Sequence, residues 1–475
     1  MTRRSFWGWG LETDEPSEAE RTATAERLSK RFGVALESPP VPRVEDLELR
    51  EPRITPPAAL ADICDTSAHA RAGHSYGKSY RDTVRAFNRQ FPNPVDVVAF
   101  PRDEGEVVSV LEWCSDSGYV AIPYGGGSSV VGGVEPPEGD RPSVSIDLGR
   151  LDRVLEVDQT SRAARIQAGV LGPALEDQLR PHGLTLRHFP QSFEWSSLGG
   201  WIATRSGGHY ATNHTHIDDF VESVRMVTPK GTWESRRLPG SGAGVSPDRM
   251  VLGSEGILGI VTEAWMRVQA RPVFRASAGA TFDSWEAASE GVRHVVQAKL
   301  WPANARVLDP VEAQNAAGMD GKRALLILGF ESAEVPQGPF LNEAIRIARE
   351  SGGEVDEGSI KIADGGSSQE EAEGAGRQGA VGAWRNSFIR APYQRNMTVG
   401  LGLVGDTFET SITWDRWPAF DANVREVVTK ALQEVCGGGT LSCRFTHVYT
   451  DGPAPYYTFQ GLGRPGAELE MWAAL

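Results

Sequence analysis

Short apolar runs recur between Pro94 and Val268, and glycine, proline or charged residues separate them. Such runs predict β-strands, whose successive side chains point to opposite faces of a sheet. Residues 104–118 and 172–183 instead carry apolar positions at helical spacing, and Pro173 stands where a helix would begin. We therefore predict an α+β domain with strands near 95–100, 119–123, 143–148, 162–169, 223–229 and 259–268.

The segments on either side have different patterns. Residues 18–33 have helical periodicity, and a proline-rich crossing over 38–57 follows, so residues 1–92 should form a helical, wrapping segment. After Pro272 a second α+β region is predicted, with a strand at 323–331 and helices near 283–299, 340–350 and 417–435. Residues 363–382 are glycine-rich and low in apolar content, so we expect a mobile loop there.

Composition narrows the class of protein. The 475 residues carry 63 acidic against 48 basic side chains, a net charge of −15, which disfavours nucleic acid as a partner. No apolar stretch is long enough to span a membrane, and acidic residues follow the Arg3-Arg4 pair in place of a signal region, so we expect a cytoplasmic protein. The spacing of Cys64, Cys114, Cys436 and Cys443 predicts buried free thiols and no metal site.

The stretch PYGGGSSVVGG, residues 123–133, follows a predicted buried strand. Without a Cβ, glycine lets backbone N–H groups converge on an anion, so a nucleotide diphosphate would fit. The spacing matches neither the dinucleotide-binding fingerprint nor the P-loop, and a structural glycine turn explains the stretch as well.

Two later stretches favour the cofactor: FPQSFEWSSLGGWIATRSGGHY (189–210) and LGSEGILGIVTEAWMRV (252–268). In this order and spacing the three resemble the FAD-binding domain of the vanillyl-alcohol oxidase and p-cresol methylhydroxylase family. The resemblance implies a two-subdomain FAD-binding domain over 93–270 and an α+β substrate-binding cap domain over 271–475. It assigns FAD binding to Pro123, Tyr124, Gly125, Gly126, Gly127, Ser128, Ser129, Val130, Pro190, Gln191, Ser192, Ser196, Leu198, Gly199, Gly200, Ala203, Thr204, Glu255, Gly256, Leu258, Gly259 and Ile260.

Further stretches resemble one branch of that family, the alkylglycerone-phosphate synthases of ether-lipid synthesis. They are WGWG near the N-terminus, RHFPQSFEWSSLGGWIATR, VRMVTPKG, RVLDP, TFETSITWDR and SCRFTHVYTDGPAPYY. The implied reaction exchanges the acyl chain of acyl-glycerone phosphate for a long-chain alcohol without net oxidation. The alternative is an FAD-dependent oxidoreductase, an oxidase or dehydrogenase of a 2-hydroxy acid or alcohol. The first loop contains no histidine, so FAD is expected to bind non-covalently.

The same resemblance supplies catalytic candidates, each with a structural alternative. Tyr456 matches the family's acid–base tyrosine, or it packs as a strand residue in the cap. Arg395 matches an arginine of the substrate phosphate or flavin site, or it is a solvated surface charge. Arg306 and His188 match family residues whose roles could be structural instead. Gln191 stands where the family has an aspartate, which alters the local proton network.

Expectations about partners and the tail complete the prediction. A phosphorylated lipid-like substrate and a fatty alcohol are expected, and peripheral membrane association and a homodimer are allowed. The family continues into a histidine-rich tail where this sequence stops at Leu475, so we expect a C-terminally short cap and impaired turnover. The alternative is that the sequence is a truncated or frame-shifted product of a longer gene. The segment AELEMWAAL should form a short helix that is stable only when its apolar face is packed.

Overall fold

The computed structural model describes residues 3–209, 212–240, 242–365 and 379–475, which form two compact units. The first unit comprises Met1–Gly207, His216–Gln269 and Pro392–Leu401. The second comprises Gly208–Thr215, Ala270–Ala391 and Gly402–Leu475. The chain therefore passes between the units several times, and helix α12 (Gly379–Thr398) contributes residues to both.

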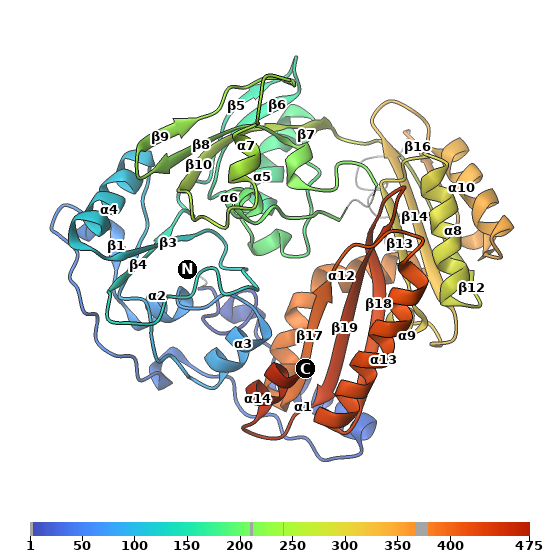
Figure 1. Cartoon of the computed structure of the whole chain (residues 1–475), viewed down its shortest axis with the longest axis horizontal. Helices are drawn as coiled ribbons and strands as arrows, with labels where there is room; N and C mark the ends of the chain where they lie inside the picture. Colours follow the sequence, from blue (N-terminus) through green and yellow to red (C-terminus); the bar gives the residue numbers. More distant parts are fainter. Residues whose placement is uncertain (1–2, 210–211, 241, 366–378) are drawn as a thin grey trace. The chain divides into compact units, whose positions relative to one another are not determined.

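The first unit contains two main sheets. One has the strand order β1-β2-β4-β3, with β2, β4 and β3 parallel (Figure 1). Its strands are Cys64–Asp65, Val97–Ala99, Ser143–Asp147 and Val120–Tyr124. The other is antiparallel with the order β5-β6-β10-β8-β9, formed by Val154–Asp158, Ala163–Gln167, Ile260–Arg267, Val221–Thr228 and Gly231–Glu234. The strands predicted between 95 and 268 are thus confirmed.

Short helices and two short strands complete this unit. The helices are α1 Glu18–Phe32, α2 Ala68–Gly73, α3 Tyr80–Phe87, α4 Glu104–Ser117, α5 Gly172–Leu179, α6 Leu198–Thr204 and α7 Asp248–Val251. The strands are β7 Leu184–Thr185 and β11 Gln269–Ala270, the latter at the boundary of the two units. A buried apolar cluster joins α5 and α6 to β6, β8 and β10, so this core holds α6 in place.

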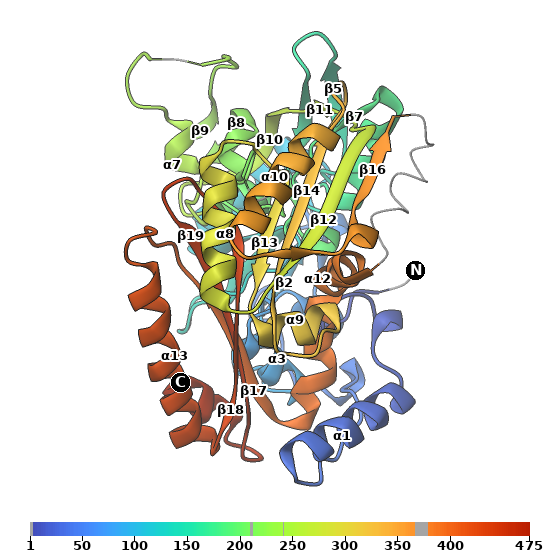
Figure 2. The ribbon, with the colours of Figure 1, turned by 90° about the vertical axis from the view of Figure 1, so that its right-hand side faces the viewer.

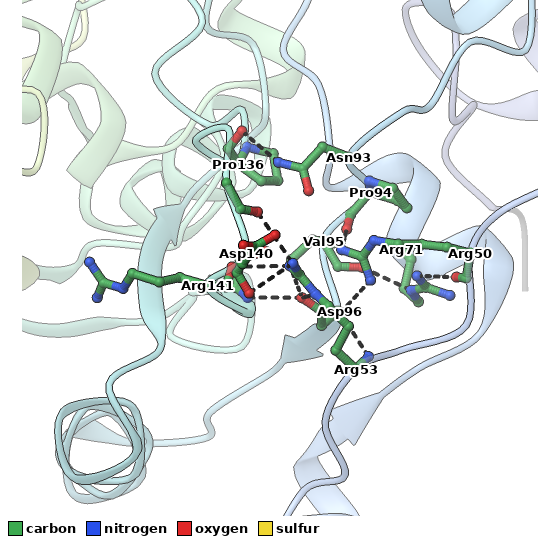
Figure 3. Close-up of polar contacts among 12 residues, drawn as sticks. Arg50, Arg53, Arg71, Asn93, Pro94, Val95, Asp96, Pro136, Asp140 and Arg141 are labelled. Carbon is green, nitrogen blue, oxygen red and sulfur yellow. Dashed lines mark hydrogen bonds and ion pairs between the residues drawn. The ribbon is translucent and has the colours of Figure 1, made fainter.

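Buried Asp96 fixes the proline-rich crossing to the first sheet (Figure 3). Its carboxylate accepts hydrogen bonds from the side chains of Arg50 and Arg53 and from the backbone N–H groups of Arg53 and Ser143. Arg71 Nη2 donates to the carbonyl oxygen of Arg50 at 2.7 Å. The wrapping segment is therefore anchored by ionic contacts as well as by apolar packing.

The second unit is built on one antiparallel sheet. Its order is β15-β12-β14-β13-β18-β19-β17, and β16 also pairs with β12. In that order the strands are Glu354–Val355, Phe274–Phe282, Ala324–Ser332, Asn304–Leu308, Gly439–Val448, Pro453–Leu462 and Leu403–Glu409, with β16 at Lys361–Asp364. The helices are α8 Trp285–Gln297, α9 Pro310–Ala317, α10 Gly338–Glu350, α13 Trp417–Cys436 and α14 Glu468–Ala474.

The two faces of this sheet have different roles. Helices α8, α10 and α13 cover one face, where they bury Ala305, Val307, Leu326, Cys443 and Tyr457 with other apolar residues (Figure 2). Because side chains alternate along a strand, the neighbouring residues point to the opposite face, which α9 covers in part. This second face receives the candidate chemistry, including Arg306, Arg444 and Tyr456.

Several local expectations are corrected. The predicted mobile loop at 363–382 is wrong at both ends, because β16 extends to Asp364 and α12 begins at Gly379, while residues 366–378 lie outside the described part. All four cysteines are free thiols, but only Cys114 and Cys443 are buried, whereas Cys64 and Cys436 are half-buried. The C-terminal helix is confirmed as α14, with Met471 buried and Trp472 Nε1 donating to Asp406 at 2.9 Å.

Candidate functional site

The glycine loop, residues 125–133, leaves the end of β3 and lies against the segment just before α6. A Cβ at Gly125 would lie 2.2 Å from Ser197 Oγ, and one at Gly126 would lie 1.9 Å from the Trp195 carbonyl oxygen. Gly127 has φ +64°, in the left-handed region that favours glycine. The close backbone approach inferred from the sequence is therefore real, and its immediate cause is packing against residues 195–197.

The third predicted stretch meets the same loop. Glu255 donates its backbone N–H to the Ala203 carbonyl oxygen at 2.8 Å, and a Cβ at Gly256 would lie 3.3 Å from Pro123 Cγ. The position that a Cβ would take at Gly133 is 3.7 Å from Glu255 Oε2. Burial raises the pKa of Glu255. All three glycine-bearing stretches thus converge within the first unit.

Three cationic residues surround the glycine loop. Arg4 Nη1 donates to the Gly126 carbonyl oxygen at 2.6 Å, and its guanidinium lies 4.9 Å from the centre of the Trp195 ring. Lys78 donates its backbone N–H to Ser129 at 2.6 Å and accepts a hydrogen bond from Arg395 Nη1 at 2.8 Å. Sequence reasoning identified Arg395 but missed the other two.

Lys78 is buried, with 8% of its surface exposed, and burial followed by the nearby Arg4 guanidinium lowers its pKa to about 7. Within the described residues its ammonium group makes no hydrogen bond or ion pair. Asp82 on α3 acts on this ammonium electrostatically, and Asp82 and Glu135 both pair with Arg85, at 2.8 and 2.6 Å. Two carboxylates thus face the three cations Arg4, Lys78 and Arg85.

These residues fit FAD. The pyrophosphate of FAD is a dianion that needs backbone N–H groups, which glycine exposes, and nearby positive charge. The loop supplies the first and the cations around it supply the second. Lys78 and Arg4 would face the pyrophosphate, whereas Arg395 is engaged through Lys78.

The N-terminal WGWG stretch positions the segment that carries Arg395. Asn396, which is buried, accepts from the Trp9 N–H at 2.8 Å and donates to the Trp9 carbonyl oxygen at 2.9 Å. A Cβ at Gly8 would lie 2.9 Å from Asn396 Oδ1, so glycine is required there. Tyr393 accepts from Trp195 Nε1 at 3.0 Å and so joins the same segment to the glycine-loop region.

A second cluster lies in the second unit, on the sheet face opposite to the one that α8, α10 and α13 cover. Arg444, Tyr456 and Glu409 are paired across β18, β19 and β17, which run side by side (Figure 1). The Arg444 guanidinium lies 4.2 Å from the centre of the Tyr456 ring, and Tyr456 Oη donates to Thr407 Oγ1 at 2.9 Å. This register places a cation over the ring of Tyr456.

Buried Arg306 on β13 adds a second cation to this cluster. Its Nη2 donates to the His209 carbonyl oxygen at 2.9 Å, and its guanidinium lies 5.1 Å from the centre of the Phe388 ring. Burial, and then repulsion from Arg444, lowers the pKa of Arg306 to about 9. Arg444 pairs with Glu312 at 3.0 Å, and Glu409 on β17 acts electrostatically on both guanidinium groups. A guanidinium can donate two parallel hydrogen bonds to a phosphate, so Arg306 and Arg444 are candidates to bind a phosphorylated anion.

His188 packs within the first unit. It is buried, its Nε2 is 2.7 Å from Ser206 Oγ, and its ring packs against Trp201 and Phe220 at centroid distances of 5.1 and 5.6 Å. These contacts favour the structural alternative for His188. Neighbouring Pro190 is buried and Gln191 is half-buried.

The remaining predicted cofactor residues lie in or next to the three converging stretches. Ser192 Oγ and Ser196 Oγ are 3.1 Å apart just before α6, and Leu198, Gly199, Gly200, Ala203 and Thr204 belong to that helix. A Cβ at Gly199 would lie 2.8 Å from that of Ala168. Ser128 and Val130 lie in the loop, while Leu258 and Gly259 lead into Ile260, the first residue of β10.

The residues missed by sequence reasoning had weak signals. Arg444 stands in the alternating strand LSCRFTHV, where a charged residue between apolar neighbours marks the face opposite to the core. Lys78 and Arg4 have no such pattern, because their roles come from contacts with residues far along the chain. Within the described part, no group of three or more histidine, cysteine or acidic side chains could hold a metal ion. No helix there is long and apolar enough to cross a membrane.

Comparisons with known proteins agree with this geometry. Residues 95–235 match the family profile "FAD binding domain", and residues 271–472 match "FAD linked oxidases, C-terminal domain". The chain is 32% identical over 440 residues to alkyldihydroxyacetonephosphate synthase of Dictyostelium discoideum, covering 89% of this chain and 72% of that protein. The same enzyme of Caenorhabditis elegans is 29% identical over 411 residues, covering 82% and 68%.

A solved structure supports the same relationship. Alkyldihydroxyacetonephosphate synthase in space group P1 superposes with a TM-score of 0.83 at 26% identity, covering 99% of this chain and 93% of that chain. The α+β, FAD-binding fold predicted from the sequence is therefore confirmed. The chain belongs to the alkyldihydroxyacetonephosphate synthase family of FAD-dependent enzymes, also called alkylglycerone-phosphate synthases.

Proposed function

We propose that this protein exchanges the acyl chain of acyl-glycerone phosphate for a long-chain alcohol, the ether-forming step of ether-lipid synthesis. The observation that carries the proposal is the cluster of Arg306, Arg444 and Tyr456, which combines two cations with a hydroxyl group. A phosphorylated substrate needs the cations, and the exchange needs a group that moves protons. FAD, when bound, supplies nucleophilic chemistry that is used here without net oxidation.

The protein's own residues have distinct proposed roles. Arg306 and Arg444 bind the substrate phosphate. Tyr456 Oη, which donates a hydrogen bond to Thr407, moves the proton in this exchange. The acyl chain leaves as a carboxylate, and the incoming alcohol must give up its hydroxyl hydrogen. We propose that residues 93–270 bind the cofactor and that 271–475 bind the substrate. Arg395 retains its proposed role in binding phosphate or forming the flavin site, and its contact with Lys78 favours the latter.

The oxidoreductase alternative is favoured by one observation, the match of residues 271–472 to a profile of FAD-linked oxidases. Two assays on the FAD-loaded protein separate the candidates. Acyl-glycerone phosphate plus a labelled fatty alcohol should yield labelled ether lipid under our proposal. Anaerobic addition of 2-hydroxy acids or alcohols should instead remove the visible flavin absorbance under the alternative. Labelled product without bleaching supports the synthase, and bleaching without labelled product contradicts it.

We also propose that the protein is cytoplasmic, associates peripherally with membranes and forms a homodimer. A fatty alcohol partitions into bilayers, so contact with a membrane would bring this substrate to the site. Co-sedimentation with phospholipid vesicles tests the membrane contact. Light scattering on the eluted protein tests the dimer, and a monomer mass would contradict it.

FAD should be released intact when the purified protein is denatured. The glycine loop contains no histidine or cysteine to which the flavin could be joined. We expect yellow protein, a colourless protein pellet after acid precipitation, and free FAD in the supernatant by chromatography. Flavin that remains with the denatured chain would contradict non-covalent binding.

Arg306→Lys should raise KM for the phosphorylated substrate by about 10- to 100-fold, the range for a lost charge-assisted hydrogen bond. The flavin spectrum should not change. Arg323→Lys, at a partly exposed arginine paired with Asp283 and Glu354, is the matched control and should leave KM unaltered. An unchanged KM in folded Arg306→Lys would remove Arg306 from the phosphate site.

Arg395→Lys tests the two roles proposed for Arg395. A raised KM for the phosphorylated substrate would place Arg395 at the substrate phosphate, whereas weakened FAD binding would place it at the flavin site.

A further inference from the structure

We propose that Lys78 binds the pyrophosphate of FAD as its charge-neutralising partner and thereby couples cofactor binding to proton uptake. This inference rests on the FAD dependence of the family and not on the proposed ether-forming reaction. Its failure would therefore leave that reaction untouched. The proposal rests on Lys78 and on its contact with Ser129 of the glycine loop.

The backbone of Lys78 lies against the glycine loop. The Lys78 N–H donates to the Ser129 carbonyl oxygen at 2.6 Å, and a Cβ at Gly77 would lie 2.2 Å from that same oxygen. Residues 77 and 78 are therefore fixed against the glycine loop, within the reach of a lysine side chain. Arg395 Nη1 holds the Lys78 carbonyl oxygen at 2.8 Å from the other side. The backbone N–H and the carbonyl oxygen of Lys78 are thus both hydrogen-bonded.

The ammonium group of Lys78 is buried. An isolated ammonium group is costly to bury, and a buried lysine is normally paired or deprotonated. Lys78 is more than nine-tenths buried, and its ammonium makes no hydrogen bond or ion pair with the described residues. Asp82, the acid that acts on it, shares Arg85 with Glu135, and Arg4 adds further positive charge. An anion bound at the loop would supply the missing partner.

The affinity for FAD should depend on pH through Lys78. The pKa of Lys78 is lowered to about 7, and a bound dianion would raise it again. Affinity is then greatest below pH 7 and falls as pH rises from about 7 toward the raised pKa of the complex, because binding must take up a proton in that interval. The charged or titratable groups around this site are Arg4 from the N-terminal segment, Asp82 and Arg85 from α3, Glu135 and Glu255 beside the glycine loop, Arg395 from α12 and Tyr124 from β3. His69 Nε2 lies 3.1 Å from the carbonyl oxygen of Arg4, and His74 pairs with Asp147.

The test uses the apoprotein and three ligands. FAD and ADP contain a pyrophosphate, whereas riboflavin has none. In Lys78→Met the dissociation constants for FAD and ADP should rise by about 10- to 100-fold, and that for riboflavin should stay within about twofold. Lys230→Met, at an exposed lysine of the same unit, is the control and should alter none of them. The wild-type affinity for FAD should fall between pH 7 and 9, and that fall should be lost in Lys78→Met, although His69 and His74 remain.

Stability measurements keep the test interpretable. Apo Lys78→Met should be at least as stable as the wild type, because it no longer buries an unpartnered charge. If it does not fold, Lys78→Arg retains the charge and should retain the preference for FAD over riboflavin. Equal weakening of all three ligands, or unchanged FAD binding with a raised KM for the phosphorylated substrate, would overturn the proposal. The latter result would place Lys78 at the substrate phosphate.

Discussion

Replacing Tyr456 with phenylalanine is expected to reduce the alkyl-for-acyl exchange rate by about a hundredfold or more, the usual contribution of a positioned acid–base group. The change removes only the hydroxyl that donates to Thr407 Oγ1 at 2.9 Å, and it keeps the ring beneath the Arg444 guanidinium. FAD affinity and the flavin spectrum should therefore stay as in the wild type. The measurement is single-turnover transfer of a labelled fatty alcohol under saturating substrate.

Tyr457→Phe is a matched control on the same strand. Tyr457 points to the covered face, is fully buried and donates to Asp421 Oδ1 at 2.7 Å. Losing that hydrogen bond should reduce the free energy of unfolding by about 2 kcal/mol, the range for a bond to a charged group. The folded protein should still catalyse exchange. Wild-type exchange in Tyr456→Phe would return Tyr456 to a packing role, whereas equal losses in both variants would indicate general disruption of β19.

Local sequence patterns predicted most strands and helices because those elements follow short-range rules. Helix α8 begins after Ser284, whose hydroxyl accepts from the Ala287 N–H, and α4 ends at Gly118 in the left-handed conformation. Both signals are visible in the sequence. The predicted start of the loop at residue 363 was wrong because β16 forms by pairing with β12, a contact between distant segments.

The glycine loop illustrates what sequence could and could not reveal. Its composition predicted close backbone approach, and the structure shows that Trp195 and Ser197 are the groups that approach. The cations around it were less visible, because Arg4 meets Gly126 across 122 positions of sequence. Arg395 could be selected through family resemblance, but its contact with Lys78 required the fold. Chemistry that depends on such distant contacts needs the structure.

Asp96→Asn is expected to destabilise the first unit by about 3 kcal/mol at neutral pH. The side chain is fully buried and receives hydrogen bonds from Arg50, Arg53 and the Ser143 N–H. An asparagine amide is nearly the same size, but it lacks the charge and turns an NH₂ group toward these donors. The estimate is at the lower end of the range for a broken buried ion pair, because the arginines are 28% and 27% exposed and can regain water.

The pH dependence of this loss gives the sharper test. Burial alone would raise the pKa of Asp96, but the hydrogen bonds from Arg53, Arg50 and the backbone outweigh it, and the native pKa is lowered. A lowered pKa contributes stability that is fully present above about pH 4, the ordinary value for an unfolded aspartate, and is lost as pH falls toward the native pKa. The difference in unfolding free energy between wild type and Asp96→Asn, measured by urea titration, should therefore shrink below pH 4. Asp177→Asn, at an exposed carboxylate 3.7 Å from Arg180, should show no resolvable difference at any pH. A gap that stays constant as pH falls would mean that the substitution acts through packing alone, and that the ion pairs do not anchor the wrapping segment.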